Sequence, residues 1–169
     1  MRVAVTGGSG FIGGALIRAL DARGDDVVAL ARSDEAAQKV TAAGASAIRG
    51  GLASVAALRK TCRGADLVIH CAAKLSGAPR DADEFRKVNV AGTRHVIEAA
   101  RTTNVPRLVH LSTEQVLLGP RPIVDADESV PYPRRVIGLY AQTKQEAERL
   151  VRDANSAELE TVCVRPRFV

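Results

Sequence analysis

Tyr140 and Lys144 are the residues of this sequence whose types and spacing best suit proton transfer. They lie four positions apart in a stretch predicted to be helical, so their side chains share one helix face. A nearby ammonium stabilises tyrosinate and lowers the pKa of a phenol toward the range of a general acid or base. The same spacing also arises in ordinary surface helices. The other tyrosine, Tyr132, has Val136 four positions on and forms no such pair.

Two adjacent hydroxyls, Ser112 and Thr113, follow the apolar stretch 108–111. If that stretch is a strand, both hydroxyls lie at its carboxyl end, where open α/β sheets bind ligands. A hydroxyl at this place can bond a substrate carbonyl beside the tyrosine, although such a residue taken alone is more often a strand-end cap. The residues themselves leave open which of the two hydroxyls acts.

A glycine cluster near the N-terminus indicates a phosphate site. Gly7 and Gly10 stand between the apolar strand expected at 2–5 and the helix expected from 11 to 20, and Gly13 lies in the first turn of that helix. Glycine lets the backbone turn sharply and approach a ligand, and the N–H groups that begin a helix favour an anion. With the strand before it and the helix after it, the cluster favours a dinucleotide-binding loop over an ordinary tight turn.

The remaining elements alternate between strands and helices. Strands are expected at 27–31, 46–48, 67–71, 108–111 and 161–164, and helices at 34–43, 54–62, 83–103 and 139–153. Strands that are short and apolar on both faces indicate a buried, mostly parallel sheet. The fold class predicted is therefore α/β, a doubly wound Rossmann fold with six or more strands and helices on both faces.

One long connection, 119–136, contains four prolines and is expected to be a loop. It is longer than a structural connection requires, so it is a candidate lid facing the substrate.

Composition excludes several classes of protein. The chain has 169 residues, 46% of them hydrophobic and 25% charged, which is typical of one globular domain. No apolar run is long enough to cross a membrane and no secretory signal precedes the glycine loop, so we expect a cytoplasmic protein. The net charge of +5 invites a nucleic-acid partner, but the basic residues are dispersed and aromatics make up only 3%.

The cysteines and histidines do not indicate a metal site. Cys62, Cys71 and Cys163 show no C-x-x-C spacing and are expected to be reduced thiols. His70 and His110 lie in buried strands and are interpreted as hydrogen-bonded core residues, and His95 as a residue of a helix surface.

Taken together, the motifs carry a family resemblance over essentially the whole chain. Six occur in one order: TGGSGFIG at 6–13, VIHCAA at 68–73, NVAGT at 89–93, STEQV at 112–116, YAQTK at 140–144 and RP at 165–166. In these motifs the chain resembles the extended short-chain dehydrogenase/reductase family, which includes NAD-dependent epimerases/dehydratases and 3β-hydroxysteroid-dehydrogenase-like enzymes.

The resemblance implies a role for each matched residue. Tyr140 would be the catalytic acid/base, Lys144 would lower its pKa and hold the nicotinamide ribose, and Thr113, with Ser112 as the less favoured alternative, would bind the reacting oxygen. The residues implied for the rest of the dinucleotide are Gly7, Gly10, Phe11 and Ile12 at the pyrophosphate, Cys71, Ala72, Ala73 and Asn89 along its path, and Arg167 at the nicotinamide end. The family also implies a smaller substrate-selecting part beyond this Rossmann domain of residues 1–169.

The sequence departs from the family pattern near the adenosine. Gly51-Leu52 stands where an acidic residue is usual, so Leu52 is expected beside the adenine without that side-chain contact. The second strand ends at Arg32 instead of the Asp or Glu that accepts hydrogen bonds from the ribose of NAD. A guanidinium suits a 2′-phosphate, although Arg32 could also be a plain surface arginine. NADP is therefore the expected cofactor, ahead of NAD.

Three hypotheses for the function follow from these observations. The first is an NAD(P)-dependent oxidoreductase acting on a carbinol or carbonyl carbon, from which a sugar-nucleotide epimerase or dehydratase cannot be separated by sequence. The second is a non-catalytic dinucleotide sensor, which would not need both Tyr140 and Lys144. Nucleic-acid binding ranks last. The partners expected are a small-molecule substrate and a second copy of the chain in a homodimer, with no nucleic acid and no membrane.

Overall fold

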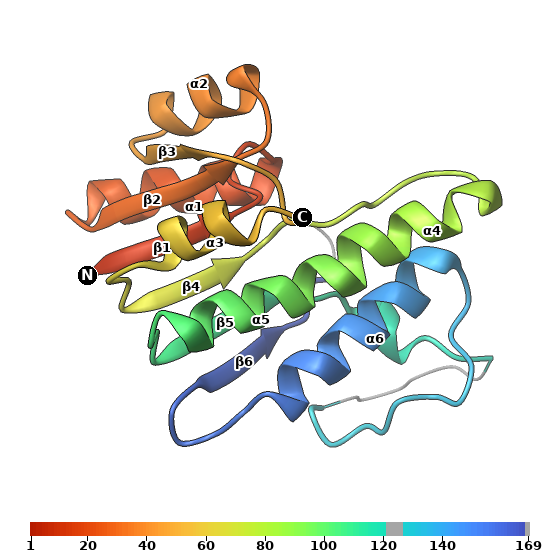
Figure 1. Cartoon of the computed structure of the whole chain (residues 1–169). Coiled ribbons are helices and arrows are strands. Elements are labelled where there is room, and N and C mark those ends of the chain that lie inside the picture. The colour runs from red at the N-terminus through yellow and green to blue at the C-terminus, as the bar shows by residue number, and fades with distance from the viewer. Residues whose placement is uncertain (121–126, 168–169) are drawn as a thin grey trace.

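The computed structural model describes residues 1–120 and 127–167, which form a six-stranded parallel sheet flanked by helices (Figure 1). The strands are β1 (Arg2–Thr6), β2 (Asp26–Ala31), β3 (Ser46–Arg49), β4 (Leu67–His70), β5 (Arg107–Leu111) and β6 (Glu160–Val164). Their order across the sheet is β3-β2-β1-β4-β5-β6, and every neighbouring pair is parallel.

The helices lie at or close to the predicted ranges. They are α1 (Phe11–Ala22), α2 (Asp34–Ala42), α3 (Val55–Cys62), α4 (Ala82–Phe85), α5 (Gly92–Thr102) and α6 (Leu139–Asp153). Local signals explain two of the beginnings, because the hydroxyls of Ser33 and Ser54 cap α2 and α3 by accepting from backbone N–H groups three residues on. Gly24 and Gly44 follow α1 and α2 with positive φ, as expected where a helix ends.

Both faces of the sheet are covered because successive strand residues point to opposite sides. In β1, Val3 and Val5 join an apolar cluster with α1 and α2, whereas Ala4 joins a second cluster with α3, α5 and α6. Figure 1 shows α3, α5 and α6 in front of the sheet and α1 behind it. The doubly wound arrangement predicted from the sequence is confirmed.

The stretch 83–103, expected to be one α-helix, is helical but not uniform. A π-helical segment at Arg86–Ala91 separates α4 from α5, and a short 3₁₀ turn, Pro79–Asp81, precedes α4. The wider turn contains Asn89, whose side chain bonds the backbone of Lys74 on both its N–H and its C=O. Single π-helical turns inside α-helices are often found at functional sites.

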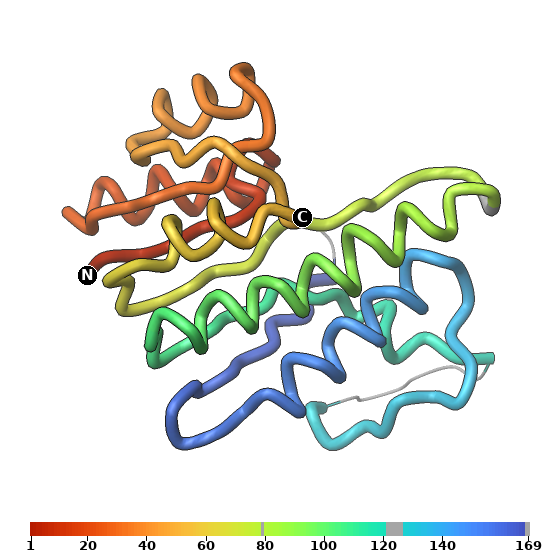
Figure 2. Tube along the Cα trace, viewed as in Figure 1, coloured from red at the N-terminus to blue at the C-terminus, as the bar shows by residue number. Residues whose placement is uncertain are grey.

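The long connection before α6 contains no helix or strand in the part that the structure describes, and residues 121–126 lie outside that part. Figure 2 traces the described residues before α6, in cyan, below that helix. The connection is fastened there by Tyr132, whose hydroxyl donates to the buried Glu148 carboxylate at 2.5 Å and whose ring lies 4.4 Å from the Arg149 guanidinium. Its described residues therefore pack on α6, and none of them lines the main cavity, as a lid would.

Candidate active site

A cavity of about 950 Å³ opens at the carboxyl ends of the strands, around the point where the strand order reverses between β1 and β4. Its size is at the upper end of the roughly 300–1,000 Å³ usual for small-molecule sites. The predicted residues that line it are Gly7, Gly10, Phe11, Ile12, Arg32, Leu52, Cys71, Ala72, Ala73, Thr113, Tyr140 and Arg167. Asn89 and Lys144, the other two, are buried outside its wall, with exposed fractions of 1% and 2%.

The glycines of the first loop have two different physical roles. Gly7 has φ of +76°, and a Cβ there would lie 2.5 Å from the Ala72 nitrogen, so the close approach of β1 to the residues after β4 requires glycine. A Cβ on Gly13 would lie 2.3 Å from the Gly7 oxygen. Gly10 differs, because its φ of −84° suits any residue and a Cβ would meet only the Gly7 oxygen, at 3.3 Å. Its side-chain position is on the cavity wall.

The N-terminus of α1 fits the pyrophosphate of a dinucleotide. Gly10 is the N-cap and supplies no side-chain hydrogen bond, and the first turn carries no acidic residue. The backbone of Phe11, Ile12 and Gly13 lies in the cavity wall. Helix N-terminal N–H groups need acceptors, and the positive end of the helix dipole favours an anion.

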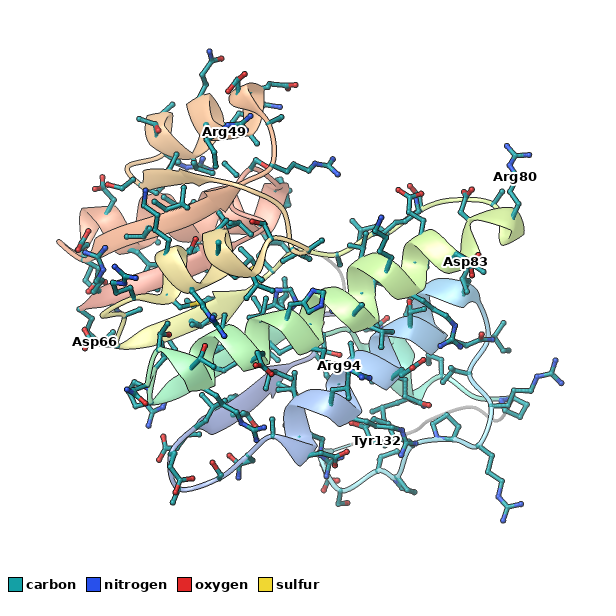
Figure 3. All side chains as sticks on the ribbon, in the orientation of Figure 1. Arg49, Asp66, Arg80, Asp83, Arg94 and Tyr132 are labelled. Carbon is teal, nitrogen blue, oxygen red and sulfur yellow. The ribbon has the colours of Figure 1, made fainter. Side chains whose placement is uncertain are left out.

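The part of the cavity where the adenosine of a dinucleotide is expected is lined by Leu30, Arg32 and Leu52. Arg32 is exposed and directly follows β2. Asp34, the first acidic residue after the strand, already belongs to α2 and pairs with Arg49 Nε at 3.1 Å. Figure 3 labels Arg49 beside α2. The absence of a carboxylate at the end of β2, inferred from the sequence, thus holds in the structure.

Tyr140 is half-buried at the start of α6 and lines the same cavity. Burial raises the pKa of its phenol above the ordinary value of 10, and the Glu114 carboxylate raises it further, whereas hydrogen bonding by Thr113 lowers it. A lowered pKa was expected from Lys144, and in this structure the shift is in the opposite direction. At neutral pH Tyr140 is a neutral phenol, the form that donates a proton.

The two candidate hydroxyls have different surroundings. Thr113 Oγ1 donates to Glu114 Oε2 at 3.0 Å and accepts from the Gln115 N–H as the cap of the 3₁₀ turn Glu114–Leu117. Ser112 Oγ is buried near the Glu148 carboxylate, without a hydrogen bond of normal geometry to any described residue. Of the two hydroxyls, only that of Thr113 acts on Tyr140, and this favours Thr113 as the hydroxyl that faces a substrate oxygen.

The family is identified by a match of residues 4–169 to the model of the 3-beta hydroxysteroid dehydrogenase/isomerase family. The chain belongs to this family. The assignment agrees with the six ordered motifs and with the Rossmann sheet.

Two relatives of this family member are reductases. It is 49% identical over its whole length to 4-hydroxy-2-methyl-3-oxo-4-farnesyl-3,4-dihydroquinoline-1-oxide ketoreductase of Stigmatella aurantiaca, covering 50% of that protein. It is 42% identical to 2-alkyl-3-oxoalkanoate reductase of Stenotrophomonas maltophilia, covering all of this chain and 51% of that protein. The chain thus spans about half the length of the curated relatives it matches.

Solved structures share the fold and bind NAD. A short-chain dehydrogenase/reductase superfamily protein from Agrobacterium tumefaciens with bound NAD superposes with a TM-score of 0.84 at 32% identity, over 98% of this chain and 48% of that one. The complex of Thermus thermophilus UDP-glucose 4-epimerase with NAD gives a TM-score of 0.81 at 29% identity. The match covers 98% of this chain and 54% of the epimerase chain. Reductases and epimerases therefore both occur among the proteins and solved structures that are similar to this chain.

Lys144 matches the lysine of the family motif, and its ammonium contacts two acceptors on β5. Nζ donates to the Leu111 carbonyl at 2.7 Å and lies 3.1 Å from His110 Nε2. Burial lowers the pKa of Lys144 from 10.5 to about 8, against the opposing effect of the Glu148 charge. The ammonium is thus directed to acceptors of β5 in this structure.

Of the two core histidines, only His70 has partners on both ring nitrogens. Its Nδ1 and Nε2 lie 2.6 Å from Thr6 Oγ1 and 3.0 Å from Thr93 Oγ1, so its interpretation as a hydrogen-bonded core residue is confirmed. The same interpretation must be corrected for His110, because its Nδ1 is buried and has no hydrogen-bond partner among the described residues. No sequence pattern predicts the partners of His110, because its contact is with Lys144, which lies 34 positions away in the chain.

Two further residues support the cavity from outside its wall. Asn89 accepts from the Lys74 N–H at 2.7 Å and donates to Thr143 Oγ1 at 3.0 Å, which joins the segment after β4 to α6. His95, on α5, donates to the carbonyl of Leu52, a residue of the cavity wall, at 2.8 Å. The implied contact of Asn89 with the cofactor stays a prediction.

The remaining expectations concern metal binding, the cysteines and membrane-spanning helices. Within residues 1–120 and 127–167, no group of three or more His, Cys, Asp or Glu side chains is placed to hold a metal ion. Cys62, Cys71 and Cys163 are free thiols, and burial raises the pKa of Cys71 to about 11. No described helix is long and apolar enough to span a membrane.

Proposed function

We propose that this chain carries the dinucleotide site and the proton donor of an NAD(P)-dependent ketone reductase. The observation on which the proposal rests is that the Tyr140 phenol lies in the same cavity as the uncapped N-terminus of α1. The raised pKa of Tyr140 suits donation to a carbonyl oxygen. Two relatives are named as reductases of 3-oxo compounds with farnesyl or alkyl substituents. Their names support the same direction of reaction.

The residues that would hold the dinucleotide follow from their places on the cavity wall. The N–H groups of Phe11 and Ile12, with Gly7 and Gly10 leaving room, would bind the pyrophosphate. Leu52 would pack beside the adenine, residues 71–73 would border the path toward the nicotinamide, and Arg167 would lie at its far end. Lys144 would reach the nicotinamide ribose from below.

NADP is the proposed cofactor, with NAD as the alternative. The support is the exposed Arg32 at the end of β2, together with the pairing of Asp34 to Arg49. A guanidinium binds a phosphate with two parallel hydrogen bonds, and no carboxylate stands at the strand end to repel it.

When bound, the reduced dinucleotide supplies hydride to the substrate carbon. The chain contributes the proton: the Tyr140 hydroxyl donates to the substrate oxygen, and the Thr113 hydroxyl orients that oxygen. Lys144 lies one helical turn further along α6, with its ammonium held by Leu111 and His110. Apolar wall residues such as Leu75 and Val88 favour a substrate with a hydrocarbon part.

A sugar-nucleotide epimerase or dehydratase on the same scaffold is the second candidate. The likeness to the UDP-glucose 4-epimerase structure supports it. Epimerisation is redox-neutral, so it consumes no reduced dinucleotide overall, whereas ketone reduction consumes one equivalent for each product molecule. The expected homodimer stays a prediction.

The test uses the protein at its full natural length with a panel of 3-oxo alkyl ketones and UDP-sugars. Ketone-dependent oxidation of NADPH or NADH is expected, and Tyr140→Phe should lower turnover about a hundredfold or more while keeping dinucleotide affinity. The other tyrosine provides the matched control, because Tyr132→Phe should leave turnover unchanged. An active Tyr140→Phe protein, or turnover of UDP-sugars alone, would refute the proposal.

A further inference from the structure

His110 and Lys144 form a buried pair that neither the fold nor the proton transfer described above accounts for. His110 Nε2 lies 3.1 Å from Lys144 Nζ, and the exposed fractions of the two residues are 0% and 2%. The second acceptor of the lysine is the Leu111 carbonyl, the next residue along β5, at 2.7 Å. Two adjacent residues of one strand therefore hold the same ammonium.

The contact determines which nitrogen of His110 carries the proton. An ammonium only donates, so Nε2 must offer its lone pair, and the ring proton of a neutral imidazole must then reside on Nδ1. That nitrogen has no hydrogen-bond partner among the described residues and is buried. An unpaired buried donor costs about 1–3 kcal/mol, so a strand position that keeps one needs a reason.

The groups around the pair keep Lys144 as the donor and His110 as the acceptor. Burial, and secondarily the Lys144 charge, lower the pKa of His110 well below 6.5, so the ring stays neutral. The other titratable groups that act on Lys144 are Glu148 on its own helix, Cys71 after β4 and Cys163 on β6. Glu148 is already engaged by Tyr132 and Arg165, and both thiols have raised pKa values, so they remain protonated at neutral pH.

The neighbouring histidine is not an alternative partner for the lysine. The His70 ring lies 5.1 Å from the His110 ring, and hydroxyls occupy both of its nitrogens. His70 thus packs beside His110 and restricts its ring without taking part in the contact with Lys144.

We propose that His110 is a positioning residue for Lys144: it accepts one ammonium N–H on Nε2 while Leu111 accepts a second, so that a single N–H in a fixed direction remains for one further acceptor. The functional consequence, that this remaining N–H serves the nicotinamide ribose, rests on the proposed function. The pairing itself does not.

The direct test is the tautomer of His110, read from side-chain ¹H–¹⁵N correlation spectra of the protein labelled with ¹⁵N-histidine. We expect the Nδ1–H form, which is the less common one for a neutral histidine, in the absence of any dinucleotide. Lys144→Met removes the donor and should convert His110 to the Nε2–H form, while His95 keeps its signals. An Nε2–H ring in the wild type, or no change with Lys144→Met, would overturn the pairing even if the protein proved to be a ketone reductase.

A second arm tests the positioning role with variants of the acceptor. His110→Phe should weaken NADPH binding about tenfold, the scale of one lost charge-assisted hydrogen bond, and His110→Gln should recover part of it. Arg94→Gln, at an exposed position of α5, is the control and should leave affinity unchanged. If His110→Phe folds and binds NADPH like the wild type, the role is wrong; if it does not fold, the tautomer measurement on the wild type still decides.

Discussion

The Thr113 hydroxyl donates to the Glu114 carboxylate at a distance of 3.0 Å between Oγ1 and Oε2, although the two residues are adjacent in the chain. The contact places a negative charge beside the hydroxyl that acts on Tyr140. Glu114 therefore influences both groups that would face a substrate oxygen, and it helps to keep Tyr140 protonated.

Replacing this charge should change the titration of Tyr140. Glu114→Gln should lower the pKa of Tyr140, because the carboxylate raises it and the amide keeps a hydrogen bond available to Thr113. The chain contains two tyrosines and no tryptophan, so tyrosinate absorbance in a Tyr132→Phe background reports on Tyr140 alone. Circular dichroism at each pH controls for unfolding. A pKa of Tyr140 that stays the same or rises would contradict this assignment.

Gly10→Val should abolish dinucleotide binding while the fold survives. The backbone at Gly10 suits any residue, and a Cβ would meet only the Gly7 oxygen, so the added side chain would fill the pyrophosphate space. Calorimetric titration with NADPH and NADH measures the loss, and thermal unfolding checks the fold. Ala15→Val, on the exposed side of α1, is the control. Wild-type affinity in Gly10→Val would show that the phosphates bind elsewhere.

Arg32→Ala should weaken NADPH binding about tenfold or more and leave NADH binding unchanged, since only NADPH carries the 2′-phosphate that a guanidinium would bind. Dissociation constants for both dinucleotides are measured on the wild type and the variant. Arg94→Ala is the matched control, because Arg94 is exposed on α5, as Figure 3 shows. NADH binding as tight as NADPH binding in the wild type would rule out the preference.

Lys144 should make the free energy of unfolding depend on pH above neutrality. Burial lowers its pKa from 10.5 to about 8 in the folded chain, so between these values the unfolded chain binds a proton that the folded chain does not. Stability therefore rises with pH through that window, by up to about 3 kcal/mol, and the contribution is complete above the unfolded pKa.

The measurement is urea unfolding of wild type and Lys144→Met at pH 7 and near pH 10, compared as a difference so that other titrating groups cancel. The wild type should gain stability relative to the variant at the higher pH. Lys60→Met, at an exposed position of α3, should show no such relative change. A difference between wild type and Lys144→Met that is constant with pH would mean that Lys144 keeps its ordinary pKa.

Local physical chemistry determined most of the fold. Glycines with positive φ end α1 and α2, serines begin α2 and α3, and prolines keep the connection before α6 free of helix and strand in its described part. The range predicted for α6 is the observed one, Leu139–Asp153. These features could be predicted because each depends on backbone preferences and apolar spacing within a few residues. The cavity wall could be predicted as well, because the carboxyl ends of parallel strands meet at one edge of the sheet.

Only the tertiary structure determined the pKa shifts of the site residues and the hydrogen-bond partners of their side chains. Tyr140 and Lys144 share a helix face, but burial and Glu114 raise the pKa of the tyrosine, and the lysine turns to Leu111 and His110 on β5. The residues alone left open whether Ser112 or Thr113 acts, and the different surroundings of the two hydroxyls distinguish them. The physical reason is that desolvation and hydrogen bonding depend on atoms brought together from distant parts of the chain, and spacing along one element carries no information about them.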